Sequence, residues 1–123
     1  MSAATQPLHT RWTDLELETL NPLIQRHFVV GDQIMLARIL LKKGAEVPRH
    51  SHANEQVTWI LEGALQFSID GRELVVRAGE VLCIPPHLPH AAVALEDTVD
   101  VDVFTPPRQD WITKDDAYLR GSK

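Results

Sequence analysis

The chain has 123 residues and a mass of 13.8 kDa, a length that fits one domain and excludes a second independent one. Hydrophobic residues make up 44% and charged residues 24%, a composition that excludes a chain disordered throughout. The 12 Lys and Arg against 17 Asp and Glu give a net charge of −5. Because no basic stripe is present, we expect no nucleic-acid partner.

The only cysteine, Cys83, excludes an intramolecular disulfide and any zinc site built on paired cysteines. We interpret it as a small buried side chain, because Leu82 and Ile84 flank it. No segment has the roughly 20 apolar residues of a membrane span, and residues 1–12 do not resemble a signal peptide. The sequence therefore predicts a cytoplasmic protein without a membrane partner, in which any metal is bound by His, Asn, Gln or carboxylate.

Turn-forming pairs recur from Asn21-Pro22 to Pro106-Pro107 and separate runs rich in Val, Ile, Leu and Phe. This spacing is typical of an all-β sandwich or barrel. Helix signals are weak: we expect only a short turn within 110–120, and fraying over 121–123. The predicted strands are 15–19, 24–30, 34–42, 56–62, 64–70, 72–77, 80–84, 90–95 and 98–104.

Two of these strands carry specific signals. The Asp70-Gly71 pair joins two alternating runs and predicts a hairpin with a type I′ turn, which needs positive φ at both positions. In 98–104, three valines alternate with Asp100, Asp102 and Phe104. An extended strand places these three side chains on one face, which is directed either to solvent or into a pocket.

The histidines form two patches, His50 with His52 and His87 with His90. Gln56 is in phase with His50 and His52 on an extended segment, because the three positions differ by even steps. Three prolines stiffen the second patch. Neutral imidazoles suit Zn, Ni, Fe or Cu, and three of them with one oxygen ligand leave positions open for a substrate.

These residues belong to two fixed-spacing motifs. The first runs Gly44, five residues, His50, one residue, His52, three residues, Gln56, six residues, Gly63; after fifteen residues the second runs Gly79, five residues, Pro85, four residues, His90. The pattern resembles the two signature motifs of the cupin superfamily. The resemblance implies a double-stranded β-helix (jelly-roll) barrel over 15–112, between an arm (1–14) and a tail (113–123). It also implies one divalent metal ion, Ni, Zn, Fe or Mn, bound by His50, His52, Gln56 and His90.

The motifs depart from the family pattern at three positions. Gln56 replaces the usual Glu, which keeps an oxygen ligand but removes its charge, so that a bound ion becomes a stronger Lewis acid. His87 replaces a Gly, and Ala94 an Asn. We expect His87 in a turn near the rim, with an acid or base role as the alternative. Glu55 is a rival ligand, ranked below Gln56 because it is out of phase.

The C-terminal stretch narrows the resemblance from the superfamily to one family. His50-Ser51-His52, Glu55-Gln56 and the run from Asp102 to Arg108 resemble the family of the pectin-degradation protein KdgF. Those enzymes open the ring of 4,5-unsaturated uronic acid monosaccharides, from pectin or alginate breakdown, to linear 5-keto-4-deoxyuronates. The resemblance implies a small anionic sugar substrate, a homodimer and pocket roles for Asp102, Phe104 and Arg108.

The predicted roles follow the chemistry of each group. Asp102 would move a proton, Phe104 would form an apolar wall, and Arg108 would bind the carboxylate in a bidentate fork. We interpret Asp100 as structural and Trp59 as a packing residue. Two alternatives stay open: a metal-dependent cupin dioxygenase, and a cupin that binds or senses a sugar acid without catalysis.

Overall fold

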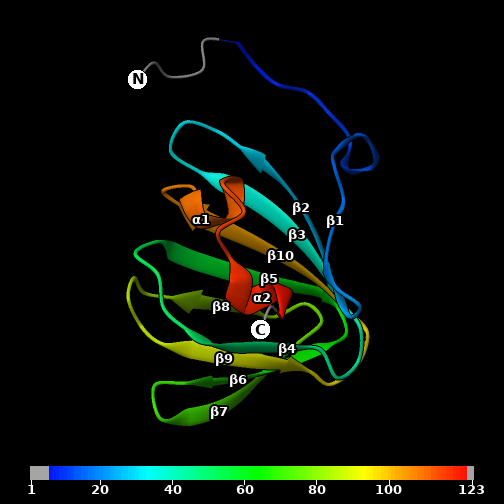
Figure 1. Cartoon of the computed structure of the whole chain (residues 1–123). Coiled ribbons are helices and arrows are strands. Elements are labelled where there is room, and N and C mark those ends of the chain that lie inside the picture. Colours follow the sequence, from blue (N-terminus) through cyan, green and yellow to red (C-terminus); the bar gives the residue numbers. More distant parts are fainter. Residues whose placement is uncertain (1–5, 122–123) are drawn as a thin grey trace.

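The computed structural model describes residues 6–121 and consists of two antiparallel sheets packed face to face (Figure 1). The order in the six-stranded sheet is β1-β2-β3-β10-β5-β8, and in the four-stranded sheet β4-β9-β6-β7. The strands are β1 Glu18–Asn21, β2 Ile24–Val30, β3 Met35–Leu41, β4 Glu46–His50, β5 Glu55–Glu62, β6 Ala64–Ile69, β7 Arg72–Arg77, β8 Val81–Ile84, β9 His90–Ala94 and β10 Thr98–Thr105. The predicted all-β jelly roll is confirmed.

Both ends of the chain lie outside the described residues: positions 1–5 of the predicted arm and positions 122–123 of the predicted tail. The described part of the arm contains a 3₁₀ turn at Trp12–Asp14. Among the described residues, no helix is long and apolar enough to cross a membrane.

The predicted hairpin is present as β6 and β7. Asp70 and Gly71 have φ angles of 52° and 71°, which a type I′ turn requires. The pairing runs from Ile69 opposite Arg72 to Ala64 opposite Arg77. This hairpin lies at one edge of the four-stranded sheet, with β7 as the edge strand.

The prediction missed β4 and placed β1 three residues early. β4 escapes the hydrophobic pattern because Pro48, Arg49 and Glu46 interrupt it, and its burial does not alternate. It is a strand because it pairs with β9, in a register that sets His50 opposite His90. The missed strand is therefore the one that brings two distant histidines together.

Strand β10 carries its polar side chains inward. Asp100, Asp102 and Phe104 are buried, whereas the three valines between them are only partly buried on the outer side. Strands β3 and β5 flank β10 in register, so its inward face lies at the centre of the six-stranded sheet. Of the two predicted directions for this face, to solvent or into a pocket, the pocket is correct.

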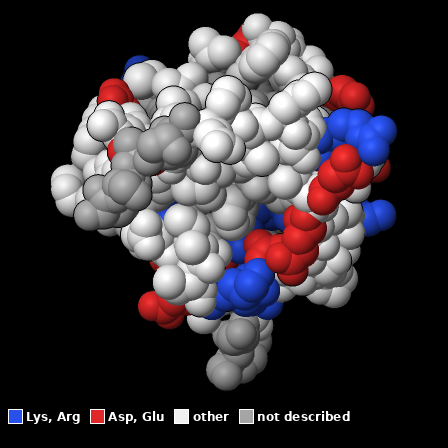
Figure 2. All heavy atoms as spheres, turned by 90° about the horizontal axis from the view of Figure 1, so that it is seen from above, with Lys and Arg blue, Asp and Glu red and all other residues white. Residues whose placement is uncertain are grey.

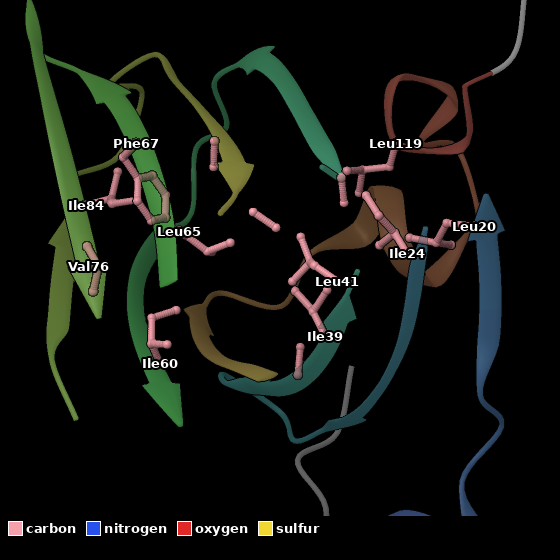
Figure 3. Close-up of a cluster of buried hydrophobic side chains, with 14 of the residues drawn as sticks. Leu20, Ile24, Ile39, Leu41, Ile60, Leu65, Phe67, Val76, Ile84 and Leu119 are labelled. Carbon is pink, nitrogen blue, oxygen red and sulfur yellow. The ribbon is translucent and has the colours of Figure 1, made fainter. Parts of the chain in front are cut away.

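The apolar core fills the space between the sheets (Figure 3). It is built by the inward residues of both sheets, and Leu119 from the C-terminus joins it beside Leu20 and Ile24 (Figure 3). Helices α1 (Gln109–Ile112) and α2 (Ala117–Arg120) follow β10. Much of the segment predicted as a tail thus packs on the barrel; we call residues 113–121 the C-terminal cap.

Candidate metal centre and cavity

Three histidines converge inside the barrel. His50 ends β4, His52 lies in the loop before β5, and His90 begins β9. Their candidate ligand atoms all lie within 4.8 Å of one another. The ring centroids of His50 and His90 are 4.3 Å apart and those of His52 and His90 5.1 Å. One metal ion could therefore be bound by all three imidazoles.

The hydrogen bonds of these rings select the tautomer that a metal needs. The Nδ1 atoms of His50, His52 and His90 lie 2.8, 3.1 and 2.9 Å from the carbonyl oxygens of residues 48, 54 and 88. Because a carbonyl only accepts, each Nδ1 carries the proton and each Nε2 keeps its lone pair. The Nε2 of His52 is buried without a hydrogen-bond partner among the described residues. The donor set therefore fits a metal ion.

Burial keeps these imidazoles neutral. Loss of hydration lowers the pKa of His50 and of His52 to about 4, and the positive charge of Arg108 acts in the same direction. Desolvation likewise lowers the pKa of His90. At neutral pH the three rings are therefore uncharged, the form in which imidazole binds metals.

The reason predicted for the convergence was wrong. His50, His52 and Gln56 do not share one extended segment, because β4 and β5 belong to different sheets and a loop separates them. Gln56 lies on β5 in the six-stranded sheet and lines the same cavity as His50 and His90. The candidate oxygen ligand thus faces the histidines from the opposite wall.

A chain of hydrogen bonds connects Gln56 to Asp102. Gln56 Nε2 donates to Thr58 Oγ1 at 2.8 Å, and Thr58 Oγ1 donates to Asp102 Oδ1 at 2.7 Å. All three side chains are buried. The chain fixes the amide so that Gln56 Oε1 stays free for a ligand, and it holds one oxygen of Asp102. Thr58, two residues after Gln56 on the same face, was missed by the sequence interpretation, although that phase could have indicated it.

Asp100 and Asp102 form a buried carboxyl pair. Burial, and then the charge of Asp102, raise the pKa of Asp100 well above its ordinary value. Burial also raises the pKa of Asp102, while hydrogen bonds from Asp100 and Thr58 oppose that rise. Burial therefore favours the neutral form of Asp100 more strongly than that of Asp102, and Asp102 is the better candidate for the carboxylate of the pair.

Arg108, predicted as a carboxylate fork, is already engaged. Its Nε and Nη2 donate to the two carboxylate oxygens of Asp110 at 3.0 and 2.8 Å, and Nη2 also donates to the hydroxyl of Tyr118 at 2.7 Å. The guanidinium lies over the rings of Phe104 and Trp111, 5.0 and 4.6 Å from their centroids. Among the described residues, Nη1 has no hydrogen-bond partner.

The cavity is lined by the residues predicted for substrate contact. Its volume is about 60 Å³, and Asp102, Phe104 and Arg108 are among its walls. Trp111 and Tyr118 also line it. No local sequence signal identified Tyr118, because its position depends on how the C-terminal cap packs.

Glu55 and His87 lie outside this cavity. Glu55 is exposed on the outward side of β5, which agrees with its predicted phase and separates it from Gln56. His87 is exposed in a turn with a φ of 69°. Its backbone N–H donates to the carbonyl of His52 at 2.7 Å. The main chain of His87 therefore stabilises the loop that carries the candidate ligand His52.

Comparisons with known proteins identify the family of this chain. A cupin-domain family model matches residues 37–105. The pectin degradation protein KdgF of Dickeya dadantii (strain 3937) is 26% identical over 98 residues, which cover 77% of this chain and 89% of that protein. The solved structure of KdgF from Halomonas sp. has a TM-score of 0.80 and 26% identity, and the match covers 86% of this chain and 99% of that one.

A dioxygenase is also similar. The 3-hydroxyanthranilate 3,4-dioxygenase of Neurospora crassa is 26% identical over 119 residues, which cover 92% of this chain and 64% of that protein. The relatives thus share a fold but carry names of different reactions. Because the family model spans more than half of the chain, this protein belongs to the cupin family.

Proposed function

We propose that this cupin opens the ring of 4,5-unsaturated uronic acid monosaccharides, derived from pectin or alginate, to linear 5-keto-4-deoxyuronates. The observation that carries the proposal is a group of three neutral imidazoles, two of which, His50 and His90, line a cavity whose walls also include Asp102, Phe104 and Arg108. The similarity to KdgF proteins supports the choice of substrate class.

The reaction needs one proton to move. In the cyclic form, O5 is both the hemiacetal oxygen of C1 and the enol-ether oxygen of C5. Removal of the proton from the C1 hydroxyl forms the aldehyde, and the electrons of the C1–O5 bond move to O5. The resulting enolate accepts a proton at C4 and becomes the ketone. Atoms and charge balance, so that the reaction is an isomerisation without a co-substrate.

A divalent ion, when bound by His50, His52, His90 and Gln56, supplies Lewis acidity that stabilises negative charge on substrate oxygen. Asp102 accepts the proton of the C1 hydroxyl and returns it to C4. The Thr58 hydroxyl, bonded to Oδ1 of Asp102, orients that carboxylate. Nη1 of Arg108 is available for the substrate carboxylate, and Phe104 excludes water beside it.

The proposal is tested by incubating metal-loaded protein with the unsaturated galacturonate monosaccharide and following the ultraviolet absorbance of its double bond. We expect loss of absorbance well above the spontaneous rate, abolished by a chelator and restored by the divalent ion. A rate equal to the spontaneous one, with full metal occupancy, contradicts the proposal.

A cupin dioxygenase is the second candidate, because a 3-hydroxyanthranilate dioxygenase is among the relatives. Ring opening consumes no oxygen, so turnover that is unchanged under anaerobic conditions favours the isomerisation. Turnover that stops without oxygen favours the dioxygenase. Binding of the uronate without conversion instead favours the non-catalytic sugar-acid binding cupin.

We also propose that the protein is a homodimer formed by the outer face of the six-stranded sheet. Trp59 is 48% and Val81 65% exposed there, and Cys83, predicted to be buried, is exposed beside them. Further apolar side chains continue this face across the sheet: Leu36, Val57, Leu61, Val99, Val101 and Val103. In the view from above in Figure 2, the charged side chains gather at the right and in the lower part, beside a broad area without them.

The other sheet provides a contrast within the same chain. On its outer side Gln66 donates to Glu73 at 2.9 Å, and Arg49 donates to Ser68 at 3.0 Å. A sheet with one solvated face is normally polar on that face, and large exposed apolar patches mark interfaces. An isologous contact of this outer face between two copies would bury the valines of β10, which explains why they lie on the outer side of the strand while its aspartates lie on the inner side.

Trp59→Lys is expected to convert the dimer to monomer, because a charge then lies in the middle of the apolar contact. Gln66→Lys, on the polar sheet, is the matched control and is expected to stay dimeric. Sedimentation equilibrium at micromolar concentration measures both. A wild-type protein that is monomeric at 100-fold higher concentration contradicts the dimer.

A further inference from the structure

The C-terminal cap forms one wall of the cavity. Tyr118 and Leu119 line it, and Leu119 is buried against the core (Figure 3). The Tyr118 ring lies 4.7 Å from the ring of His50. In Figure 1, α2 lies in front of the opening between the two sheets. The cap therefore forms part of the wall beside the candidate metal centre.

The cavity is too small to hold the proposed substrate. Its volume is about 60 Å³, whereas a buried cavity that accepts benzene measures about 150 Å³. A six-carbon sugar acid has about twice as many non-hydrogen atoms as benzene. A wall of the cavity must therefore move before the sugar acid enters.

The cap is the wall best suited to move. The two sheets are held by continuous ladders, whereas α2 has only four residues and is too short to be stable alone. Its position depends on tertiary contacts, and several of these are ion pairs. Asp116 pairs with Arg26 and with Arg120, both at 2.7 Å, and Lys114 pairs with Glu18.

Part of this ion-pair network lies near solvent. The side chains of Lys114 and Arg120 are 50% and 27% exposed, whereas those of Arg26 and Asp116 are fully buried. Partly exposed ion pairs are weak, because water competes for both charges. Opening of the cap must also separate the buried Arg26–Asp116 pair and withdraw Leu119 from the core, so the closed cap predominates and its opening is transient.

Tyr118 joins the cap to Arg108. Its hydroxyl oxygen accepts a hydrogen bond from Arg108 Nη2 at 2.7 Å, so the hydroxyl proton is left to donate elsewhere. Nη1 of Arg108 is also free of hydrogen-bond partners within residues 6–121. A carboxylate in the cavity can accept from both donors, and such charge-assisted bonds are strong.

We propose that the C-terminal cap opens to admit the sugar acid and closes over it, and that Tyr118 is a further substrate-binding residue, which donates to the carboxylate beside Arg108. The identity of the substrate rests on the proposed function. The size and the carboxylate of that substrate motivate both parts of the proposal, but neither part is tested through turnover.

Amide hydrogen exchange tests the opening without any activity assay. We expect the amides of 115–121 to exchange about 100-fold faster than those of β2 and β3, which open only on unfolding. The double variant Lys114→Gln, Arg120→Gln removes the exposed ion pairs and is expected to increase cap exchange a further several-fold. Arg11→Gln breaks the exposed Arg11–Asp14 pair far from the cap and is the matched control.

Cap amides that exchange as slowly as the strand amides, in wild type and double variant alike, overturn the opening. Faster exchange of the strands as well would show general destabilisation, which also contradicts a separate motion of the cap.

Tyr118→Phe tests the ligand contact, because it keeps the ring beside His50 and removes only the hydroxyl. D-Galacturonate, a saturated sugar acid that cannot react, is the probe. We expect its affinity, measured by calorimetry on metal-loaded protein, to fall about tenfold in Tyr118→Phe and to be unchanged in Asp115→Asn, an exposed position in the same cap.

Equal affinities in the wild type and Tyr118→Phe, or no binding of galacturonate to the wild type, overturn the role of Tyr118. A tenfold loss in a protein that does not convert the unsaturated uronate supports the Tyr118 contact and contradicts only the proposed function. The two proposals can therefore fail separately.

Discussion

Asp102→Asn is expected to lower kcat for the unsaturated uronate by about 100-fold or more, the usual contribution of a general acid or base. The amide has nearly the shape of the carboxylate but does not accept the C1 proton. Because Asp102 is held by Thr58 at 2.7 Å rather than placed among the three imidazoles, metal content is expected to stay the same. The absorbance assay and elemental analysis measure the two effects.

Asp100→Asn is the matched control, since Asp100 is buried on the same face of β10 and has no proposed contact with substrate. The amide of Asn has nearly the shape of the neutral carboxyl group of Asp100. We expect kcat to stay within about threefold of wild type. A loss as large as that of Asp102→Asn would show that the pair acts as a unit and would contradict the assignment to Asp102 alone.

The same control has a pH-dependent effect on stability. Burial, and then the charge of Asp102, raise the pKa of Asp100 above its ordinary value near 3.8. Between the two values the folded state binds more protons than the unfolded state, so wild-type stability falls as pH rises through this window. Asp100→Asn removes that loss. We expect the variant to be more stable than wild type at pH 7, with a difference that vanishes below pH 4 in urea unfolding.

The fold was predictable where a local pattern decides the structure. The Asp70-Gly71 turn needs only its own residues to specify a hairpin. The alternation in β10 fixed which side chains share a face. It did not fix which face is inside, because Asp on the inner side and Val on the outer side reverse the usual pattern. The same reversal explains why Cys83 and Trp59 were predicted as packed and are exposed.

The candidate site depended on contacts that no local pattern reports. The histidine motifs identified the three imidazoles, but a phase argument over residues 50–56 gave the wrong reason for their approach. They meet because β4 pairs with β9, which sets His50 opposite His90, residues that are distant in sequence. Tyr118 accepts a hydrogen bond from Arg108, ten residues earlier, and the buried Arg26–Asp116 pair holds the segment that carries Tyr118 on the barrel. Such long-range pairings require the assembled fold.

His52→Ala is expected to lower the affinity for the divalent ion by about 100-fold or more, since even a residue behind the ligands is worth 10- to 100-fold. The Nε2 of His52 is buried without a partner within the described part of the chain, and burial lowers the pKa of this imidazole to about 4. Removal of the ring therefore deletes a neutral, preformed donor. Metal content after dialysis measures the loss.

His87→Ala separates the ring of a histidine from its main chain. The His87 side chain is exposed, and its backbone N–H, which every variant except proline keeps, donates to the carbonyl of His52. We therefore expect His87→Ala to retain the metal. If it lost metal as completely as His52→Ala, the ion would be bound near the rim by His87, and the assignment of the buried three-histidine centre would be wrong. Retention in His87→Ala together with loss in His52→Ala locates the ion inside the barrel, where Asp102 and Arg108 line the cavity.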